Sequence, residues 1–204
     1  MQVIQEENVD IPGIARQIAG GATLVFPTET CYCLGSDATS TDAVEKIFEI
    51  KKKQKTKSVL VVMKDQEMAR DYVAWTPQID TLAQMYWPGP LSIVAKALPD
   101  ISLPEGVLAR DGTIAFRISK HPFVQKLMEH LQVPLVATSA NIFGGKSAYS
   151  IVDVKAQFEQ EVKKPDIMID GGVLPEKLPS TIVKVTPDVH ILRQGEIIIP
   201  EIVI

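Results

Sequence analysis

The sequence predicts an α/β (α+β) domain in which helices flank a twisted, open, mixed sheet. Short apolar runs alternate along the chain with amphipathic segments, and most of these runs are rich in Val and Ile. Clusters of Gly and Pro separate the two kinds of segment. Alternation of this kind is typical of strands that are joined through helices. We expect residues 1–204 to fold as one domain, because no internal repeat or interdomain linker interrupts the pattern.

Helices are predicted where apolar residues recur three or four positions apart behind a capping side chain. In the first helix, over 10–19, Asp10 can cap the N-terminus and Pro12 suits the first turn. In the second, over 40–51, Val44 and Ile47 share one face. The remaining helices are predicted over 67–73, 79–86, 122–131 and 151–162.

Strands are predicted where apolar runs are too short for a helix and end at turn residues. The Val-rich run over 58–63 is one example, and the run over 91–96, which follows Trp87-Pro88-Gly89-Pro90, is another. The other strands are predicted over 22–26, 113–118, 134–138, 167–169, 181–185 and 189–192.

The composition excludes several classes of protein. Hydrophobic residues make up 46% of the 204 residues and charged residues 23%, which is ordinary for a globular chain and unlike a disordered one. Because the formal net charge is −4, any phosphate or nucleic-acid site must be a local patch. No apolar run approaches the ~18 residues of a membrane span, so we expect no membrane partner. The N-terminus shows no secretory signal and two cysteines cannot build a disulfide framework, which favours a cytoplasmic location.

Polar loops that follow predicted strands are the candidate sites, because sites in α/β folds gather where strands end. The loop over 27–35 carries hydroxyls and a carboxylate, which suits a small polar substrate or an ordinary turn. The segment 51–57 contains five lysines. It forms either a solvated basic face at a helix C-terminus or a clamp for phosphate or RNA.

Two further loops and one strand add candidate anion ligands. The loop over 138–147 carries small hydroxyl and amide side chains that suit phosphate, although Ala140 stands where a P-loop requires glycine. Ser180 begins another loop, and Arg193 follows further on. Arg117 lies in an apolar strand, so its guanidinium needs an anion, either a ligand or a structural ion-pair partner.

The cysteines and histidines do not have the spacing of a zinc site. Cys31 and Cys33 are interpreted as small buried apolar residues. No histidine stands in a recognisable catalytic triad, so the sequence gives little support to hydrolysis through a nucleophile.

Taken in order, these loops resemble the YrdC/Sua5 family of threonylcarbamoyl-AMP synthases. The resemblance runs from about Gly20 to Gly195. The matching motifs are Phe26-Pro27-Thr28-Glu29-Thr30, Tyr32, Leu34-Gly35, Ile50-Lys51, Lys53, Trp87-Pro88-Gly89-Pro90-Leu91-Ser92, Ile114-Ala115-Phe116-Arg117-Ile118, His121-Pro122, Pro134-Leu135-Val136-Ala137-Thr138-Ser139-Ala140-Asn141, Gly144, Asp170-Gly171-Gly172, Ser180-Thr181-Ile182-Val183, Ile191-Leu192-Arg193 and Gly195.

The resemblance implies a YrdC-like fold with a large concave basic cavity, in the short form without the second C-terminal domain of longer members. It implies that L-threonine, bicarbonate and ATP give L-threonylcarbamoyladenylate and pyrophosphate. Mg²⁺ would arrive with ATP, with no metal ligand from the protein. The product would serve the N6-threonylcarbamoyladenosine (t6A37) modification of tRNA through a downstream threonylcarbamoyl transferase complex.

Position by position, the resemblance also implies the site residues. Threonine and bicarbonate would contact Thr30, Tyr32, Arg117, Ala137 and Ser180. The nucleotide would contact Lys51, Lys53, Lys57, Thr113, Ser139, Asn141, Ser147 and Arg193. Lys51, Lys53 and Tyr32 would be the catalytic residues.

Three positions depart from the family pattern. Lys53 replaces an arginine and loses its bidentate fork, Cys33 replaces a glycine, and Val62 replaces a histidine that often contacts threonine. These departures leave two alternatives to the synthase. One is a catalytically weak paralogue that binds nucleotide, tRNA or double-stranded RNA through the 51–57 patch. The other is an enzyme of the same fold that uses another amino acid.

Overall fold

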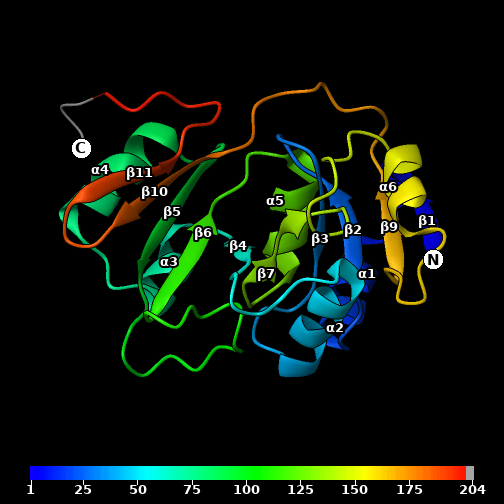
Figure 1. Cartoon of the computed structure of the whole chain (residues 1–204), viewed down its shortest axis with the longest axis horizontal. Helices are drawn as coiled ribbons and strands as arrows, with labels where there is room; N and C mark the ends of the chain where they lie inside the picture. Colours follow the sequence, from blue (N-terminus) through cyan, green and yellow to red (C-terminus); the bar gives the residue numbers. More distant parts are fainter. Residues whose placement is uncertain (201–204) are drawn as a thin grey trace.

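Two mixed β-sheets organise the fold in the computed structural model, which describes residues 1–200 (Figure 1). The strands are β1 (Gln2–Gln5), β2 (Leu24–Pro27), β3 (Tyr32–Gly35), β4 (Leu60–Val62), β5 (Leu91–Lys96), β6 (Thr113–Arg117), β7 (Leu135–Val136), β8 (Thr138–Ser139), β9 (Ile167–Asp170), β10 (Thr181–Val185) and β11 (Val189–Arg193). The helices are α1 (Ile11–Ala19), α2 (Thr41–Lys51), α3 (Gln66–Tyr72), α4 (Pro77–Tyr86), α5 (Pro122–His130) and α6 (Ile151–Phe158), with a short 3-10 turn at Glu6–Asn8.

The sheets contain five and six strands. The first has the order β1-β9-β2-β3-β8 and the second β11-β10-β5-β6-β4-β7. Each mixes directions: β2 runs parallel to β9 and antiparallel to β3, and β5 runs parallel to β10 and antiparallel to β6. The predicted mixed α/β architecture is therefore confirmed, with the strands divided between two sheets instead of one.

Because side chains alternate along β2, consecutive residues of this strand pack in two different apolar clusters. Leu24 and Phe26 pack with Ile18 of α1 and Leu127 of α5. Val25, which points the other way, belongs to the cluster that also contains residues of α2 and α6. Helices consequently cover both faces of the five-stranded sheet, and its inner strands β2 and β3 are buried on both sides.

The six-stranded sheet has one apolar face and one polar face near its centre. Ile93 of β5 and Phe116 of β6 pack in the same cluster as Leu82 of α4. Their chain neighbours, Ser92 and Arg117, point to the opposite face because consecutive strand residues alternate. Both of these polar side chains are nevertheless buried, which places them against other protein groups and not in solvent.

The end of α2 places Lys51 in the protein interior and reverses the direction of the chain that follows. Ser40 caps the helix by accepting a hydrogen bond from the Ala43 N–H, and the helix ends at Lys51. Lys52 then takes a left-handed conformation with φ 50° and ψ 40°, which reverses the chain. The Lys53 N–H donates to the Phe48 carbonyl across this turn.

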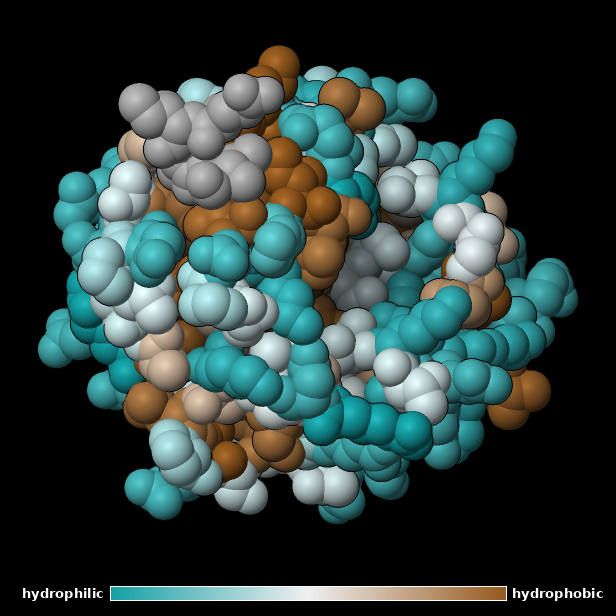
Figure 2. All heavy atoms as spheres, turned by 60° about the vertical axis from the view of Figure 1, so that its left-hand side comes forward, coloured by the Kyte–Doolittle hydropathy of each residue, from teal (hydrophilic) through white to brown (hydrophobic). Residues whose placement is uncertain are grey.

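Apolar side chains are exposed at the end of the molecule that holds β11 and α4. Figure 2 brings this end forward and shows apolar surface gathered in its upper half among hydrophilic side chains. Ile191 and Leu192 of β11 are exposed. Within residues 1–200, none of the helices has the length and apolarity needed to cross a membrane.

Candidate functional site

A cavity of about 220 Å³ is lined by residues from both sheets and from the loops that join them. The five-stranded sheet and the segments beside it contribute Thr30, Cys31, Cys33, Ala137, Thr138 and Ser139. The six-stranded sheet contributes Leu60, Arg117 and Ile182. Loops and strand ends add Lys53, Ser58, Val59, Ser147, Pro179, Ser180 and Arg193.

Arg117 is the buried cation at one end of this cavity. Its side chain is 3% exposed, and Nη1 lies 3.2 Å from Oε1 of Glu29. Nη1 also donates to the Thr30 hydroxyl at 3.5 Å. The guanidinium Nε is buried and has no hydrogen-bond partner within residues 1–200. The guanidinium thus combines a structural ion pair with a donor that is still free for an anion.

A second arginine braces the part of the wall that Ser180 forms. Arg193 donates from Nε and Nη2 to the Ser180 carbonyl, at 3.1 and 2.8 Å, and from Nη2 to the Ser180 hydroxyl at 3.0 Å. That hydroxyl also lies 2.9 Å from the hydroxyl of Ser92. Gly195 closes the brace, because a Cβ there would collide with the Pro179 carbonyl and the Ser180 backbone. Burial lowers the pKa of Arg193.

Lys51 lies behind the cavity wall and supports it. The side chain is 3% exposed, and Nζ donates to the carbonyls of Ser139 and Asn141 and to the Asn141 side-chain oxygen at 2.9 Å. The Ser139 hydroxyl donates to that same side-chain oxygen at 2.7 Å. Burial, followed by the charge of Lys53, lowers the pKa of Lys51 to about 8. The ammonium therefore ties the end of α2 to the polar turn at β8.

Lys53 is the one lysine of the 51–57 run that lines the cavity. Its Nζ donates to the Ser58 carbonyl at 3.0 Å and lies 5.8 Å from the centre of the Phe48 ring. Burial, followed by the charge of Lys57, lowers the pKa of Lys53 to about 8. The cavity thus receives one cation from this run, beside the two guanidinium groups.

The other lysines of the run are engaged on the outside of the protein. Lys52 pairs with Glu161 and Lys55 with Glu45, each at 2.6 Å. Lys57 stands 4.8 Å from the centre of the Phe143 ring and does not line the cavity. The run is consequently a set of separate local contacts and not a uniform basic face.

Two further residues of the predicted site lie away from the cavity. Tyr32 is fully buried, and its hydroxyl donates to the Gly172 carbonyl at 2.8 Å and accepts from the Gly171 N–H at 2.9 Å. Burial raises the pKa of Tyr32 to about 12. Thr113 begins β6, at the other end of the strand from Arg117, and its hydroxyl donates to Asp111 at 2.6 Å.

Among the residues implied by the resemblance, the structure brings together Thr30, Lys53, Arg117, Ala137, Ser139, Ser147, Ser180 and Arg193 on the cavity wall, with Lys51 and Asn141 directly behind Ser139.

The two cysteines are predicted to be small buried apolar residues, and Cys33 is 3% exposed and packs in the apolar cluster that contains α1 and α5, with Cys31 packed against it. The sequence did not indicate that both residues also line the cavity. Val62 does not line the cavity; it is fully buried and is the register partner of Arg117.

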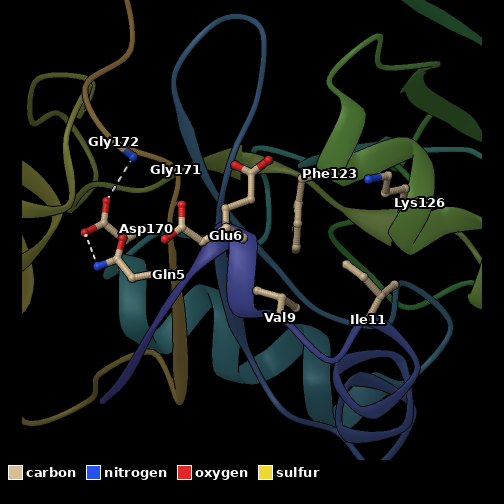
Figure 3. A pocket seen from close by; sticks show the side chains of 10 residues that line it. Gln5, Glu6, Val9, Ile11, Phe123, Lys126, Asp170, Gly171 and Gly172 are labelled. Carbon is tan, nitrogen blue, oxygen red and sulfur yellow. Dashed lines mark hydrogen bonds between the residues drawn. The ribbon is translucent and has the colours of Figure 1, made fainter.

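A larger cavity of about 600 Å³ lies elsewhere and contains none of the predicted site residues (Figure 3). Its lining mixes the carboxylates of Glu6, Glu7 and Asp170 with the amine of Lys126. Asp170 accepts from the Gln5 amide at 3.2 Å and from the Gly172 N–H at 3.0 Å, as the dashed lines show. Within residues 1–200, no group of three or more His, Cys, Asp or Glu side chains is placed to hold a metal ion.

Comparison with known proteins gives curated relatives over most of the chain. The threonylcarbamoyl-AMP synthase of Marinobacter nauticus is 33% identical over 176 residues, which cover 84% of this chain and 90% of that protein. The threonylcarbamoyl-AMP synthase of Bacillus subtilis is 31% identical over 202 residues, which cover 97% of this chain and 57% of that protein.

Structural comparison agrees with the sequence relatives. The solved structure of Pyrococcus abyssi Sua5 complexed with L-threonine has a TM-score of 0.83 and 30% identity, covering 95% of this chain and 56% of that chain. The chain therefore spans little more than half of the Bacillus and Pyrococcus proteins. A family model described as telomere recombination (Sua5_yciO_yrdC) matches residues 16–195. Because that model matches most of the chain, the protein belongs to the Sua5/YciO/YrdC family.

Proposed function

We propose that this protein is an L-threonylcarbamoyladenylate synthase, which converts L-threonine, bicarbonate and ATP into threonylcarbamoyl-AMP and pyrophosphate. One observation carries the proposal: side chains that the resemblance assigns to the amino acid and side chains that it assigns to the nucleotide line the same cavity. The relatives that bear this name, and the L-threonine complex of the Pyrococcus relative, support it.

The amino acid is proposed to bind at the Arg117 end. A carboxylate satisfies the unpartnered Nε of Arg117, and the low exposure of the guanidinium strengthens that contact. The Ser180 hydroxyl, held by Ser92 and Arg193, is ready to bond a polar group of the substrate. Thr30 supplies a second hydroxyl beside Arg117. This end of the cavity thus suits an α-amino acid that carries its own hydroxyl.

The phosphates are proposed to bind at the end that holds Lys53, Ser139 and Ser147. The threonine amine attacks the bicarbonate carbon and water leaves, which gives a carbamate. A carbamate oxygen then displaces pyrophosphate from the α-phosphorus of ATP. Lys53 and Arg193 neutralise negative charge as the pyrophosphate leaves, so the reaction needs positioning and charge compensation instead of a covalent nucleophile. Lys51 acts indirectly, by holding the Ser139 backbone. Mg²⁺ is expected to enter with ATP as part of the substrate.

Tyr32 is proposed to have a structural role in this reaction. Its hydroxyl is engaged by the backbone of Gly171 and Gly172, so we assign it a structural part in positioning that turn. We further propose that the product passes to a threonylcarbamoyl transferase that modifies tRNA. A carbamoyl-adenylate is a reactive mixed anhydride, which favours rapid transfer.

Val62 favours a second candidate, the same chemistry with a different amino acid. Val62 is the register partner of Arg117 and cannot offer a hydrogen bond. The selectivity for a substrate hydroxyl therefore rests on Thr30 and Ser180. Sites that bond a substrate hydroxyl reject analogues that lack it by about 10⁴-fold or more. A comparison of threonine, serine and valine therefore distinguishes the two candidates.

The decisive experiment measures pyrophosphate release from ATP with threonine and bicarbonate each omitted in turn. The synthase requires both, and release should fall to the background of ATP alone when either is absent. An Arg117→Ala variant serves as the matched control, because it removes the proposed carboxylate ligand. Pyrophosphate release that does not depend on threonine, measured on folded protein that binds ATP, would contradict the proposal. A panel of amino acids then identifies an alternative substrate.

A further inference from the structure

Cys31 and Cys33 form a thiol pair on the wall of the substrate cavity. Both line the cavity, whereas the side chain between them, Tyr32, points the other way to the Gly171–Gly172 turn. Cys31 lies in the bend that precedes β3, and Cys33 is the second residue of that strand. The Cys33 sulfur also lies 3.9 Å from the Thr28 hydroxyl. The chain contains two cysteines in total, so every thiol of the protein is in this site.

The surroundings shift the pKa values of the two cysteines in opposite directions. Interaction with the Cys33 thiol is the largest influence on Cys31, and with the charges of Arg117 and Lys51 it outweighs burial. Together these influences lower the pKa of Cys31 to about 7. The same interaction and its own burial raise the pKa of Cys33 well above the ordinary value. The lowered pKa favours the nucleophilic thiolate at Cys31, with a protonated partner beside it.

We propose that Cys31 and Cys33 are an oxidation site that reacts with hydroperoxides and closes to a disulfide. The Cys31 thiolate attacks one peroxide oxygen, the O–O bond breaks, and hydroxide (or an alkoxide) leaves with the electron pair, which gives a sulfenic acid. The Cys33 sulfur then attacks the Cys31 sulfur, the S–OH bond breaks, and the Cys33 proton leaves with the hydroxyl as water. Two electrons pass from the thiols to the peroxide, and nothing else is consumed.

The bridge should be readily reversible. A fully extended backbone separates residues two apart by about 6.6 Å, near the upper limit of about 6.8 Å for disulfide-linked Cα atoms, and Cys31 lies in the bend just before β3. A bridge at this limit distorts the strand and is easily reduced by thiols. The bridge also pulls on the residue before Cys31, Thr30, whose hydroxyl accepts from Arg117. If the proposed function holds, oxidation therefore weakens amino-acid binding reversibly.

The test treats the folded protein with a small excess of hydrogen peroxide and records the intact mass, a measurement that does not require any activity. Wild type should lose the mass of two hydrogens, and dithiothreitol should restore it. Cys33→Ala should instead gain one oxygen that dimedone traps, because the sulfenic acid has no partner. The rate should rise with pH through about 7, as the Cys31 thiolate forms. The double variant Cys31→Ala/Cys33→Ala reports oxidation of methionine alone, which dithiothreitol does not reverse.

Activity is followed in parallel as a second measurement. Wild type should lose pyrophosphate release on oxidation and regain it with dithiothreitol, whereas Cys31→Ala should be insensitive to peroxide. A wild-type mass that does not change, or that gains oxygen without closing the bridge, would overturn the thiol-pair proposal whatever the activity. If the mass changes as expected but no threonine-dependent activity exists, the oxidation site stands and the proposed function fails.

Discussion

Glu29 and Arg117 form an ion pair of 3.2 Å in which the two side chains are 5% and 3% exposed. Glu29 lies in the loop between β2 and β3, and Arg117 ends β6, so the pair joins the two sheets at the cavity wall. Oε2 of Glu29 also accepts from the Ser119 hydroxyl. The pair therefore fixes both the position of the guanidinium and the distance between the sheets.

The first prediction concerns stability. Glu29→Ala leaves the buried Arg117 without its counter-ion, which should lower the free energy of unfolding by about 3–5 kcal/mol. Urea unfolding followed by circular dichroism measures the change. Arg110→Ala is the matched control, because it breaks an exposed pair with Glu105 and should change stability by less than ~1 kcal/mol. Equal effects of the two variants would contradict the structural importance of the buried pair.

The second prediction concerns the amino-acid site. Arg117→Lys keeps the charge but loses the planar fork, so the KM for threonine should rise at least about tenfold, a change of ~1.4 kcal/mol. The KM for ATP should change little, since the phosphates are proposed to bind elsewhere in the cavity. Steady-state pyrophosphate release measures both constants. A rise in the ATP constant alone would place the carboxylate ligand in another part of the site.

The third prediction concerns pH. Burial holds the pKa values of Lys51 and Lys53 at about 8, well below that of a free lysine. Above pH 8 the free protein therefore holds neutral lysines, whereas bound phosphate favours the charged ammonium. ATP affinity should fall as pH rises through about 8, and binding there should take up protons. Calorimetry in two buffers of different ionisation enthalpy detects the uptake; proton release on binding would disagree with this assignment.

The fourth prediction separates the lysines of the 51–57 run. Lys53→Met removes a cavity cation and should abolish most of the activity, whereas the double variant Lys52→Ala/Lys55→Ala breaks two surface ion pairs and should leave activity within about twofold. Pyrophosphate release and RNA binding at low and high salt are measured on the same samples. RNA binding that depends on Lys52 and Lys55 and falls steeply with salt would favour the RNA-binding paralogue instead.

The fifth prediction concerns Gly195. A Cβ at this position collides with the Pro179 carbonyl and the Ser180 backbone, and neither can move independently of β10. Gly195→Ala should therefore displace the brace between Ser180 and Arg193 and lower activity, at a cost in stability of about 1–3 kcal/mol. Activity and thermal unfolding are compared with Gly20→Ala, where the nearest atom is 3.3 Å from the added carbon. Normal activity in Gly195→Ala would argue against the brace.

Local patterns predicted most of the elements, including short strands such as β4, but missed β1 and β3. The helix at α2 and the strands at β5 and β6 follow from residue spacing, because each buries a face that the sequence displays. The strand predicted over 134–138 is divided into β7 and β8. β1 is mostly exposed and β3 was hidden in a polar loop, so neither displays a readable pattern. The division into two sheets depends on which strands pair, and no local pattern specifies that.

The candidate site was likewise predicted only in part from the sequence. Arg117 was conspicuous as a cation in an apolar strand, but the sequence left open whether its partner was structural, and the pair with Glu29 supplies one. The burial of Lys51 was not foreseen, because a lysine at a helix end normally reaches solvent. The sequence alone does not show that Cys31 and Cys33 line the cavity, because this depends on where β3 and the bend before it lie in the fold.

The walls of the cavity are drawn from nearly the entire length of the chain, from Thr30 to Arg193. β10, which carries the Ser180 wall, docks beside β5 as a parallel neighbour, and its partner is about ninety residues earlier in the sequence. The five-stranded sheet is also completed late, because β9 lies between β1 and β2. During synthesis on the ribosome, the cavity can therefore bind substrate only once the chain has been made as far as Arg193.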